Sequence, residues 1–183
     1  MRQSSKASLC GIISALAVVI MLSTYISPFL VYTAPAFSGL LLLITYNELG
    51  LKWSFVTYIS ISLLSLFVIA DKESAIFFTL LFGYFPTFSC AVTKAVKNKI
   101  NSFVAKLIMF NVACLLSLIL SAFVIGVDSE SIFNEGLLYL IIFALLLNVL
   151  FVVYDILILR LQLLYLTKFQ KKFRRIFKIN RKG

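Results

Sequence analysis

The chain has 183 residues, of which 62% are hydrophobic and only 13% are charged. Soluble domains are about 45–50% apolar and about 25% charged, so this composition excludes a water-soluble globule. It also excludes a disordered chain, which has little apolar surface and strong charge repulsion. The mean hydropathy of +1.06 and the net charge of +10 together predict an integral membrane protein rich in basic residues.

The apolar residues are grouped into segments of membrane-spanning length. A hydrocarbon core about 30 Å thick requires about 20 apolar residues in a helix. Six segments meet this requirement, namely 7–26, 29–47, 53–70, 74–93, 103–126 and 136–159. Pro35 either fits the start of a continuous second helix or divides that segment into a short, partly re-entrant piece. We expect an all-α compact bundle of six transmembrane helices over 1–163, followed by a basic tail over 164–183.

The distribution of charge supports six spans. With an even number of spans and the N-terminus inside, every basic residue except Lys72 falls on the inner side. Because such an asymmetry is the positive-inside pattern, both termini are expected in the cytoplasm and the protein in the cell membrane. A cleaved signal peptide is not expected, because the A-x-A-like site at Ala34–Ala36 lies well beyond the first apolar core and contains Pro35.

The chain has no acidic residue from Arg160 onward. Apolar residues recur there at three- and four-residue spacing (Leu166, Phe169, Phe173, Ile176 and Phe177), with the basic residues mostly on the rest of the helix. This pattern predicts a basic amphipathic helix on the anionic lipid of the inner leaflet. Its role is that of a topology anchor or a docking surface for a cytoplasmic partner. Nucleic-acid binding is not expected, because the apolar face has a membrane beside it.

Polar residues at membrane depth are costly and therefore mark candidate functional sites. Tyr84, Asn111 and Asn148 lie near the middle of the fourth, fifth and sixth segments. Pro86, close to Tyr84, frees a backbone carbonyl, which is tolerated at this depth in packed or water-filled cavities. The asparagines either bond across helices or join Tyr84 in hydrogen bonding a ligand, and both interpretations stay open. Asp155, toward the inner end of the sixth segment, is expected to pair with a basic residue of another helix or, less directly, to relay protons.

The outer side is acidic. Asp71 and Glu73 flank Lys72 in one loop, and Asp128, Glu130 and Glu135 lie in another. An acidic mouth attracts a cationic or amine-bearing solute, so Asp71 and Glu73 are expected near the entrance of a ligand site. The alternative is that acidic residues remain outside simply because the basic residues are kept inside.

Signatures of catalysis and metal binding are missing from the sequence. The chain has no histidine, and its three cysteines, Cys10, Cys90 and Cys114, are scattered through apolar runs as packing residues. No HExxH, GxSxG or Gly-rich phosphate motif is present, and no span carries paired carboxylates. We therefore expect no enzyme activity, no metal and no cofactor.

The first span carries small residues at four-residue spacing, Ala7, Gly11 and Ala15, which permit close approach of another helix or serve packing inside the bundle. The stretch from Lys6 to Val19, KASLCGIISALAVV, resembles the start of substrate-binding S components of energy-coupling factor (ECF) transporters. Those proteins commonly begin with a short basic stretch and a first helix with an Ala-x-x-x-Ala motif, onto which Gly11 and Ala15 fall with glycine in the first position. The chain also resembles S components in its size and in its six expected spans.

The resemblance implies a mechanism. An S component binds a vitamin or similar micronutrient from outside, docks on a membrane coupling subunit that carries two cytoplasmic ATPases, and topples to release its substrate inward. Gly11 and Ala15, with Ala7 extending their face, would dock on the coupling subunit. Tyr84, Asn111, Asn148, Asp71 and Glu73 are the substrate-binding candidates from the residues themselves. Two alternatives are a non-transporting scaffold with a partner- or lipid-binding tail, and an ion-coupled carrier working alone.

Overall fold

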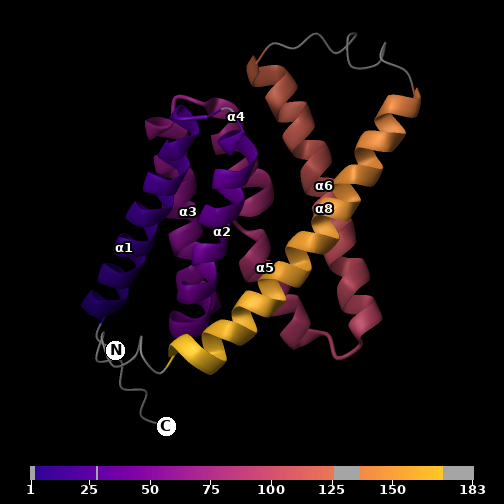
Figure 1. The fold of residues 1–183 in the computed structure, drawn as a ribbon. Helices are drawn as coiled ribbons and strands as arrows, with labels where there is room; N and C mark the ends of the chain where they lie inside the picture. Colours follow the sequence, from indigo (N-terminus) through magenta and orange to yellow (C-terminus); the bar gives the residue numbers. More distant parts are fainter. Residues whose placement is uncertain (1–2, 28, 126–136, 171–183) are drawn as a thin grey trace.

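The computed structural model describes residues 3–27, 29–125 and 137–170, while the side chains of 118, 121–125, 137–141 and 143 lie outside that description. Over these residues the protein is all-α. Six helical segments are each long and apolar enough to cross a membrane, and they pack in contact with one another (Figure 1). The predicted six-span fold is thereby confirmed.

Five spans are single helices or nearly so. The first three are α1 (Gln3–Leu22) with a 3-10 turn η1 (Ser23–Tyr25), α2 (Leu30–Leu49) and α3 (Leu51–Val68). The last two are α6 (Lys99–Ile125) and α8 (Leu137–Leu164), which continues into a π-helical turn η3 (Tyr165–Phe169). The fourth is composite, with α4 (Lys72–Phe77), the π-helical turn η2 (Phe78–Phe82) and α5 (Phe85–Ala95).

The second span is one continuous helix, which decides between the two interpretations of Pro35. Pro35 lies inside α2, close to its first turns, and is buried. Pro35 is the sixth residue of α2, so it removes the N–H that would donate to the Val31 carbonyl, and the helix nevertheless continues through it. Gly50, with a φ of 89°, then reverses the chain directly into α3. Only glycine adopts this backbone conformation readily.

The fourth span widens at its centre because of its sequence. The Gly83 N–H donates to the Phe78 carbonyl, five residues earlier, at 2.7 Å. Pro86, in the first turn of α5, has no N–H for the Phe82 carbonyl. That carbonyl packs against Gly39 of α2, where a Cβ atom would collide with it. The carbonyl predicted to be freed at membrane depth therefore lies in a packed helix interface.

Hydroxyl side chains join α2 to α1 and α3 to the fourth span. Ser38 Oγ donates to the Ala17 carbonyl of α1 at 2.9 Å, and Ser54 Oγ lies 2.6 Å from Thr87 Oγ1. All of these side chains are buried. Small hydroxyl residues let helix backbones approach closely in lipid and satisfy their polar groups at the same time.

An aromatic cluster holds α6 and α8 against α5. Phe85 packs edge-to-face on Phe110 and Phe151, with ring centroids 5.9 and 5.7 Å apart, and Phe110 and Phe151 lie 5.0 Å from each other. Tyr154 completes the cluster against Phe85 and Phe82. Beyond this cluster α6 and α8 diverge from α1–α4, and α8 crosses the bundle obliquely (Figure 1).

The bundle separates charge by end. The start of α1 and the end of η3 lie at the same end of the molecule (Figure 1). The alternation of spans places the α2–α3 and α5–α6 turns there too, with Lys52, Lys94 and Lys99. Asp71, Lys72 and Glu73 lie at the opposite end, at the start of α4. The assignment of the basic end to the cytoplasm stays an expectation of the positive-inside rule.

The last helix continues past residue 164, where the basic tail was expected to begin. The last helix runs without interruption from α8 through η3 to Phe169. Leu166 and Phe169 are exposed on this extension. Phe173, Ile176, Phe177 and the basic residues beyond Lys168 lie outside the described residues, as do Asp128, Glu130 and Glu135.

Candidate functional site

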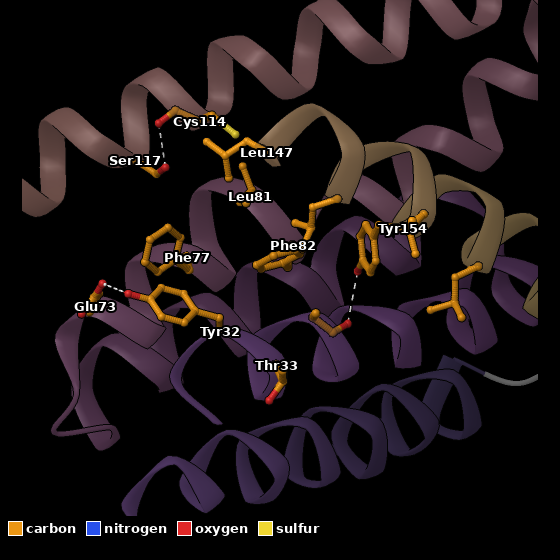
Figure 2. Close-up of a pocket in the computed structure, with 14 residues that line it drawn as sticks. Tyr32, Thr33, Glu73, Phe77, Leu81, Phe82, Cys114, Ser117, Leu147 and Tyr154 are labelled. Atoms are coloured by element: carbon orange, nitrogen blue, oxygen red, sulfur yellow. Dashed lines mark hydrogen bonds between the residues drawn. The ribbon is translucent and has the colours of Figure 1, made fainter. Parts of the chain in front are cut away.

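A pocket of about 550 Å³ lies where α6 and α8 diverge from the rest of the bundle (Figure 2). One wall comes from α2, α4 and η2, and the other from α6 and α8. The α8 wall presents a row of aliphatic side chains, Leu147, Leu150, Val153 and Leu157, together with Tyr154. Phe77, Leu81 and Phe82 face them from the fourth span. The lining is therefore mostly apolar, as in small-molecule sites generally.

The polar end of the pocket is formed by Tyr32 and Glu73. The Tyr32 hydroxyl donates a hydrogen bond of 2.8 Å to Glu73 Oε1 (Figure 2). The Tyr32 ring packs edge-on against Phe77, with centroids 5.2 Å apart, which fixes its position over the mouth. A carboxylate has about four lone-pair sites, so one tyrosine hydroxyl leaves most of its acceptor capacity for a ligand.

The lysine between the two acids does not neutralise them. Lys72 Nζ donates instead to the carbonyls of Leu66 and Ile69, at 2.8 and 3.1 Å, and so satisfies the last carbonyls of α3. Asp71 Oδ2 is buried and has no hydrogen-bond partner within the described part of the chain. Glu73 likewise has no basic side chain within ion-pair distance among the described residues. Among the described residues, neither acid at this end of the pocket has an ion-pair partner, and Asp71, Lys72 and Glu73 together leave it negatively charged.

The other polar atoms of the pocket are already satisfied. Tyr154 donates its hydroxyl proton to the Ala36 carbonyl at 3.1 Å, and Ser117 Oγ donates to the Cys114 carbonyl at 2.8 Å. Both interactions are visible in Figure 2. The pocket consequently has one strongly polar end, at Glu73, and an apolar body.

Of the five predicted substrate-binding residues, the structure brings only Glu73 into this pocket. Asp71 precedes α4 at the same end of the bundle, two residues from Glu73. Asn111 and Asn148 bind each other: Asn111 Nδ2 lies 3.0 Å from Asn148 Oδ1, and the reverse distance is 3.4 Å. Each amide also donates to a carbonyl one turn earlier in its own helix. This arrangement favours the interhelical role for the two asparagines.

Tyr84 lies in a different place. Its ring packs edge-on against Tyr58, with centroids 6.3 Å apart, and lines a second groove between α3, α5 and α6. The fourth span lines the pocket with α4 and η2, and it lines the groove with Tyr84 and α5. Tyr84 and Glu73 therefore contribute to separate cavities.

The small residues of the first span face outward. Ala7, Gly11 and Ala15 are exposed, while Leu9, Cys10, Ile13 and Ser14 make the buried face of α1. A Cβ atom added at Gly11 meets nothing within 4 Å. Packing within the described chain therefore does not explain the small residue at position 11.

The sequence-based reasoning missed a polar network at the basic end. Asp155 of α8 accepts hydrogen bonds from Lys106 of α6 and Ser89 of α5. Among the described residues, Lys106 is the one charged partner of Asp155. Two turns further along α8, Gln162 accepts a hydrogen bond from the Cys90 thiol at 3.1 Å and donates to Asn47 at 3.4 Å. The expected pairing of Asp155 with another helix is confirmed. Its partner is Lys106 of α6.

The six apolar spans and the enclosed polar network define a multi-pass membrane protein with an amphipathic pocket at membrane depth. The described residues contain no group of three acidic, cysteine or histidine side chains arranged to hold a metal ion. Comparison with family models, with curated proteins and with solved structures yields no match for this chain.

Proposed function

We propose that the protein is the substrate-binding membrane subunit of an ECF-type uptake transporter for a small organic solute, a vitamin or similar micronutrient. The observation that carries the proposal is the pocket of about 550 Å³ with a carboxylate at its mouth. A cavity of this size accommodates a small organic molecule. The resemblance of residues 6–19 to S components supplies the transporter class.

The chemistry of the pocket indicates the class of solute. Aliphatic side chains of α8 and aromatic ones of the fourth span suit an apolar body. Glu73, and Asp71 beside it, favour a cationic or amine-bearing head group, because Lys72 is engaged with the end of α3. An uncompensated carboxylate attracts cations and repels anions at the entrance. The favoured substrate is thus an amine with a largely apolar body.

The exposed face of α1 supports docking on a second membrane protein. A helix that presents Ala7, Gly11 and Ala15 to its surroundings allows a partner backbone to approach closely. In the proposed assembly this partner is the coupling subunit with its two cytoplasmic ATPases. ATP hydrolysis then belongs to the partners, and this chain performs no catalysis and binds no cofactor. Its acidic end faces outward and its termini lie in the cytoplasm.

The proposal is tested by purifying the full chain from native membranes in mild detergent and identifying all proteins and small molecules that come with it by mass spectrometry. Val153→Trp fills the pocket from an α8 position that is 61% exposed, so the fold has room for it. Val149→Trp is the matched control, one turn earlier on α8, 53% exposed and not in the pocket lining.

Recovery of two ATPases and a coupling subunit, with an amine retained by the wild type and Val149→Trp but lost from Val153→Trp, is the expected result. Recovery of the bare chain from cells that contain that machinery would overturn the transporter class and favour the scaffold. A small molecule retained equally by both tryptophan variants would show that this pocket is not the binding site.

A further inference from the structure

The groove that contains Tyr84 has a chemistry opposite to that of the pocket. It has a volume of about 680 Å³ and runs between α3, α5 and α6. Four aromatic side chains line it, together with aliphatic ones: Phe55 and Tyr58 from α3, Tyr84, and Phe88 from α5. Its one charged lining residue is Lys52, at the basic end of the bundle. The pocket, by contrast, has its charge at the acidic end.

The groove starts at the basic end and runs into the bundle, where it can hold part of one lipid chain. Lys52 is the second residue of α3 and Tyr58 lies six residues later, so the α3 wall extends about 9 Å into the bundle at about 1.5 Å per residue. Trp53, next to Lys52, marks the depth of the membrane interface, where tryptophan and lysine are enriched. The groove thus begins at head-group level and continues into one leaflet.

Lys52 is free to bind an anion. Its side chain is exposed, and the structure gives it no carboxylate partner among the residues described. The surrounding charge is also positive, since Lys6 Nζ lies 5.7 Å from the centre of the Trp53 ring. A phosphate at this position would therefore meet positive charge at head-group level and apolar side chains below it.

We propose that this groove is a binding site for one anionic phospholipid, with its phosphate group at Lys52 and an acyl chain along Phe55, Tyr58 and Phe88. Charge complementarity selects this occupant: a zwitterionic lipid gains less from Lys52, because its own cationic group offsets its phosphate, and a cationic amphiphile is repelled by Lys52. The site is separate from the C-terminal tail, which was predicted to lie on anionic lipid. It is also independent of the proposed transport function.

The inference is tested by native mass spectrometry of the full chain, released from detergent micelles that contain phosphatidylglycerol or phosphatidylcholine with identical acyl chains. Lys52→Gln removes the charge at the groove, and Lys97→Gln removes an exposed charge at the same end but outside the lining. Val56→Trp fills the groove from a 51% exposed position. Its control is Leu63→Trp, 53% exposed on the same helix and outside the groove.

We expect the wild type to retain one phosphatidylglycerol in preference to phosphatidylcholine. Lys52→Gln should weaken that retention about fivefold, the contribution of one basic residue near a charged head group, and Val56→Trp should abolish it. Both controls should behave as the wild type does. Equal effects of Lys52→Gln and Lys97→Gln, unchanged retention by Val56→Trp, or equal retention of the two lipids by the wild type would each overturn the proposal.

Discussion

Lys106 and Asp155 form a buried, two-pronged ion pair between α6 and α8. Lys106 Nζ lies 3.1 Å from each carboxylate oxygen, and the two side chains are only 3% and 8% exposed. Ser89 Oγ donates a third hydrogen bond to Asp155, at 2.6 Å. The pair thus ties α8 to both α5 and α6, on the basic side of the pocket residue Tyr154.

Breaking this pair from one side should destabilise the protein strongly. Lys106→Met leaves the Asp155 charge buried and uncompensated, and Asp155→Asn does the same to Lys106. We expect each single variant to lose about 3–5 kcal/mol of stability. The double variant Lys106→Met/Asp155→Leu should recover most of the loss, because well-packed apolar residues replace both charges.

Thermal unfolding in mild detergent, followed by Trp53 fluorescence, measures this effect. Lys97→Met, at an exposed position near the same end, is the control and should unfold as the wild type does. Single variants with wild-type unfolding temperatures, or a double variant no more stable than the singles, would contradict a compensating ion pair.

The fold was predictable from the sequence because its determinants are local. The lengths of the apolar segments alone define the six spans, and the distribution of basic residues indicates that the number of spans is even. The ends of the spans shifted by a few residues, since helices continue through interfacial residues such as Lys72 and Lys99 that a hydropathy window omits. The partner of Asp155 was predictable only in kind, because a buried acid requires a base, while the sequence does not say which of the basic residues faces it.

The candidate site was less predictable because it depends on rotation and on distant contacts. Depth along a span follows from sequence position, so Asn111 and Asn148 were correctly placed at similar depth. Which side of its helix each one faces depends on packing, and they face each other. The pocket combines α2, α4, η2, α6 and α8. Tyr32, its hydroxyl donor to Glu73, carried no signal because tyrosine is common near membrane interfaces.

The asparagine pair yields a prediction that separates a structural from a ligand-binding role. The double variant Asn111→Leu/Asn148→Leu removes two interhelical hydrogen bonds, which in membrane proteins average about 0.6 kcal/mol each. We expect a small decrease in unfolding temperature and unchanged retention of any ligand bound in the pocket. Loss of the ligand from a folded double variant would restore the two asparagines as substrate-binding residues.

Two glycines in the bundle should respond oppositely to the same substitution. Gly39→Ala places a methyl group against the Phe82 carbonyl and within 3.1 Å of the Tyr154 hydroxyl, so it should destabilise the bundle by about 1–3 kcal/mol. Gly11→Ala meets open space and should be neutral or slightly stabilising, since alanine favours helix. Unfolding temperatures of the two variants in one detergent provide the measurement. Equal effects would mean that α2 and η2 do not approach as closely as described.

The exposed face of α1 makes the partner interaction testable without disturbing the fold. Gly11→Leu adds bulk at a position where a Cβ atom meets no other described residue, so the unfolding temperature of the isolated protein should not fall. Co-purification of the coupling subunit from native membranes should decrease at least tenfold. Leu16→Phe, a smaller increase in size at a 48% exposed position of α1 that is not one of the three small residues, is the control. Undiminished recovery of the coupling subunit with Gly11→Leu would assign docking to another face.

The charge at the pocket mouth should determine which solutes bind. Glu73→Gln keeps an oxygen that accepts the Tyr32 hydroxyl proton but removes the negative charge, so it changes electrostatics and leaves the geometry intact. Hexylamine and hexanol share an apolar body and differ in charge. Isothermal titration calorimetry of each with detergent-solubilised protein therefore measures how much the charged head group contributes to binding affinity. The wild type should prefer the amine, and Glu73→Gln should lose most of that preference while binding hexanol as before. Asp71→Asn, beside the lining rather than in it, should reduce the preference less.

Because the mouth is partly open to solvent, the preference for amine should also weaken at high salt. A wild type that binds the alcohol as tightly as the amine, or a Glu73→Gln variant with undiminished preference, would remove Glu73 from the recognition of substrate.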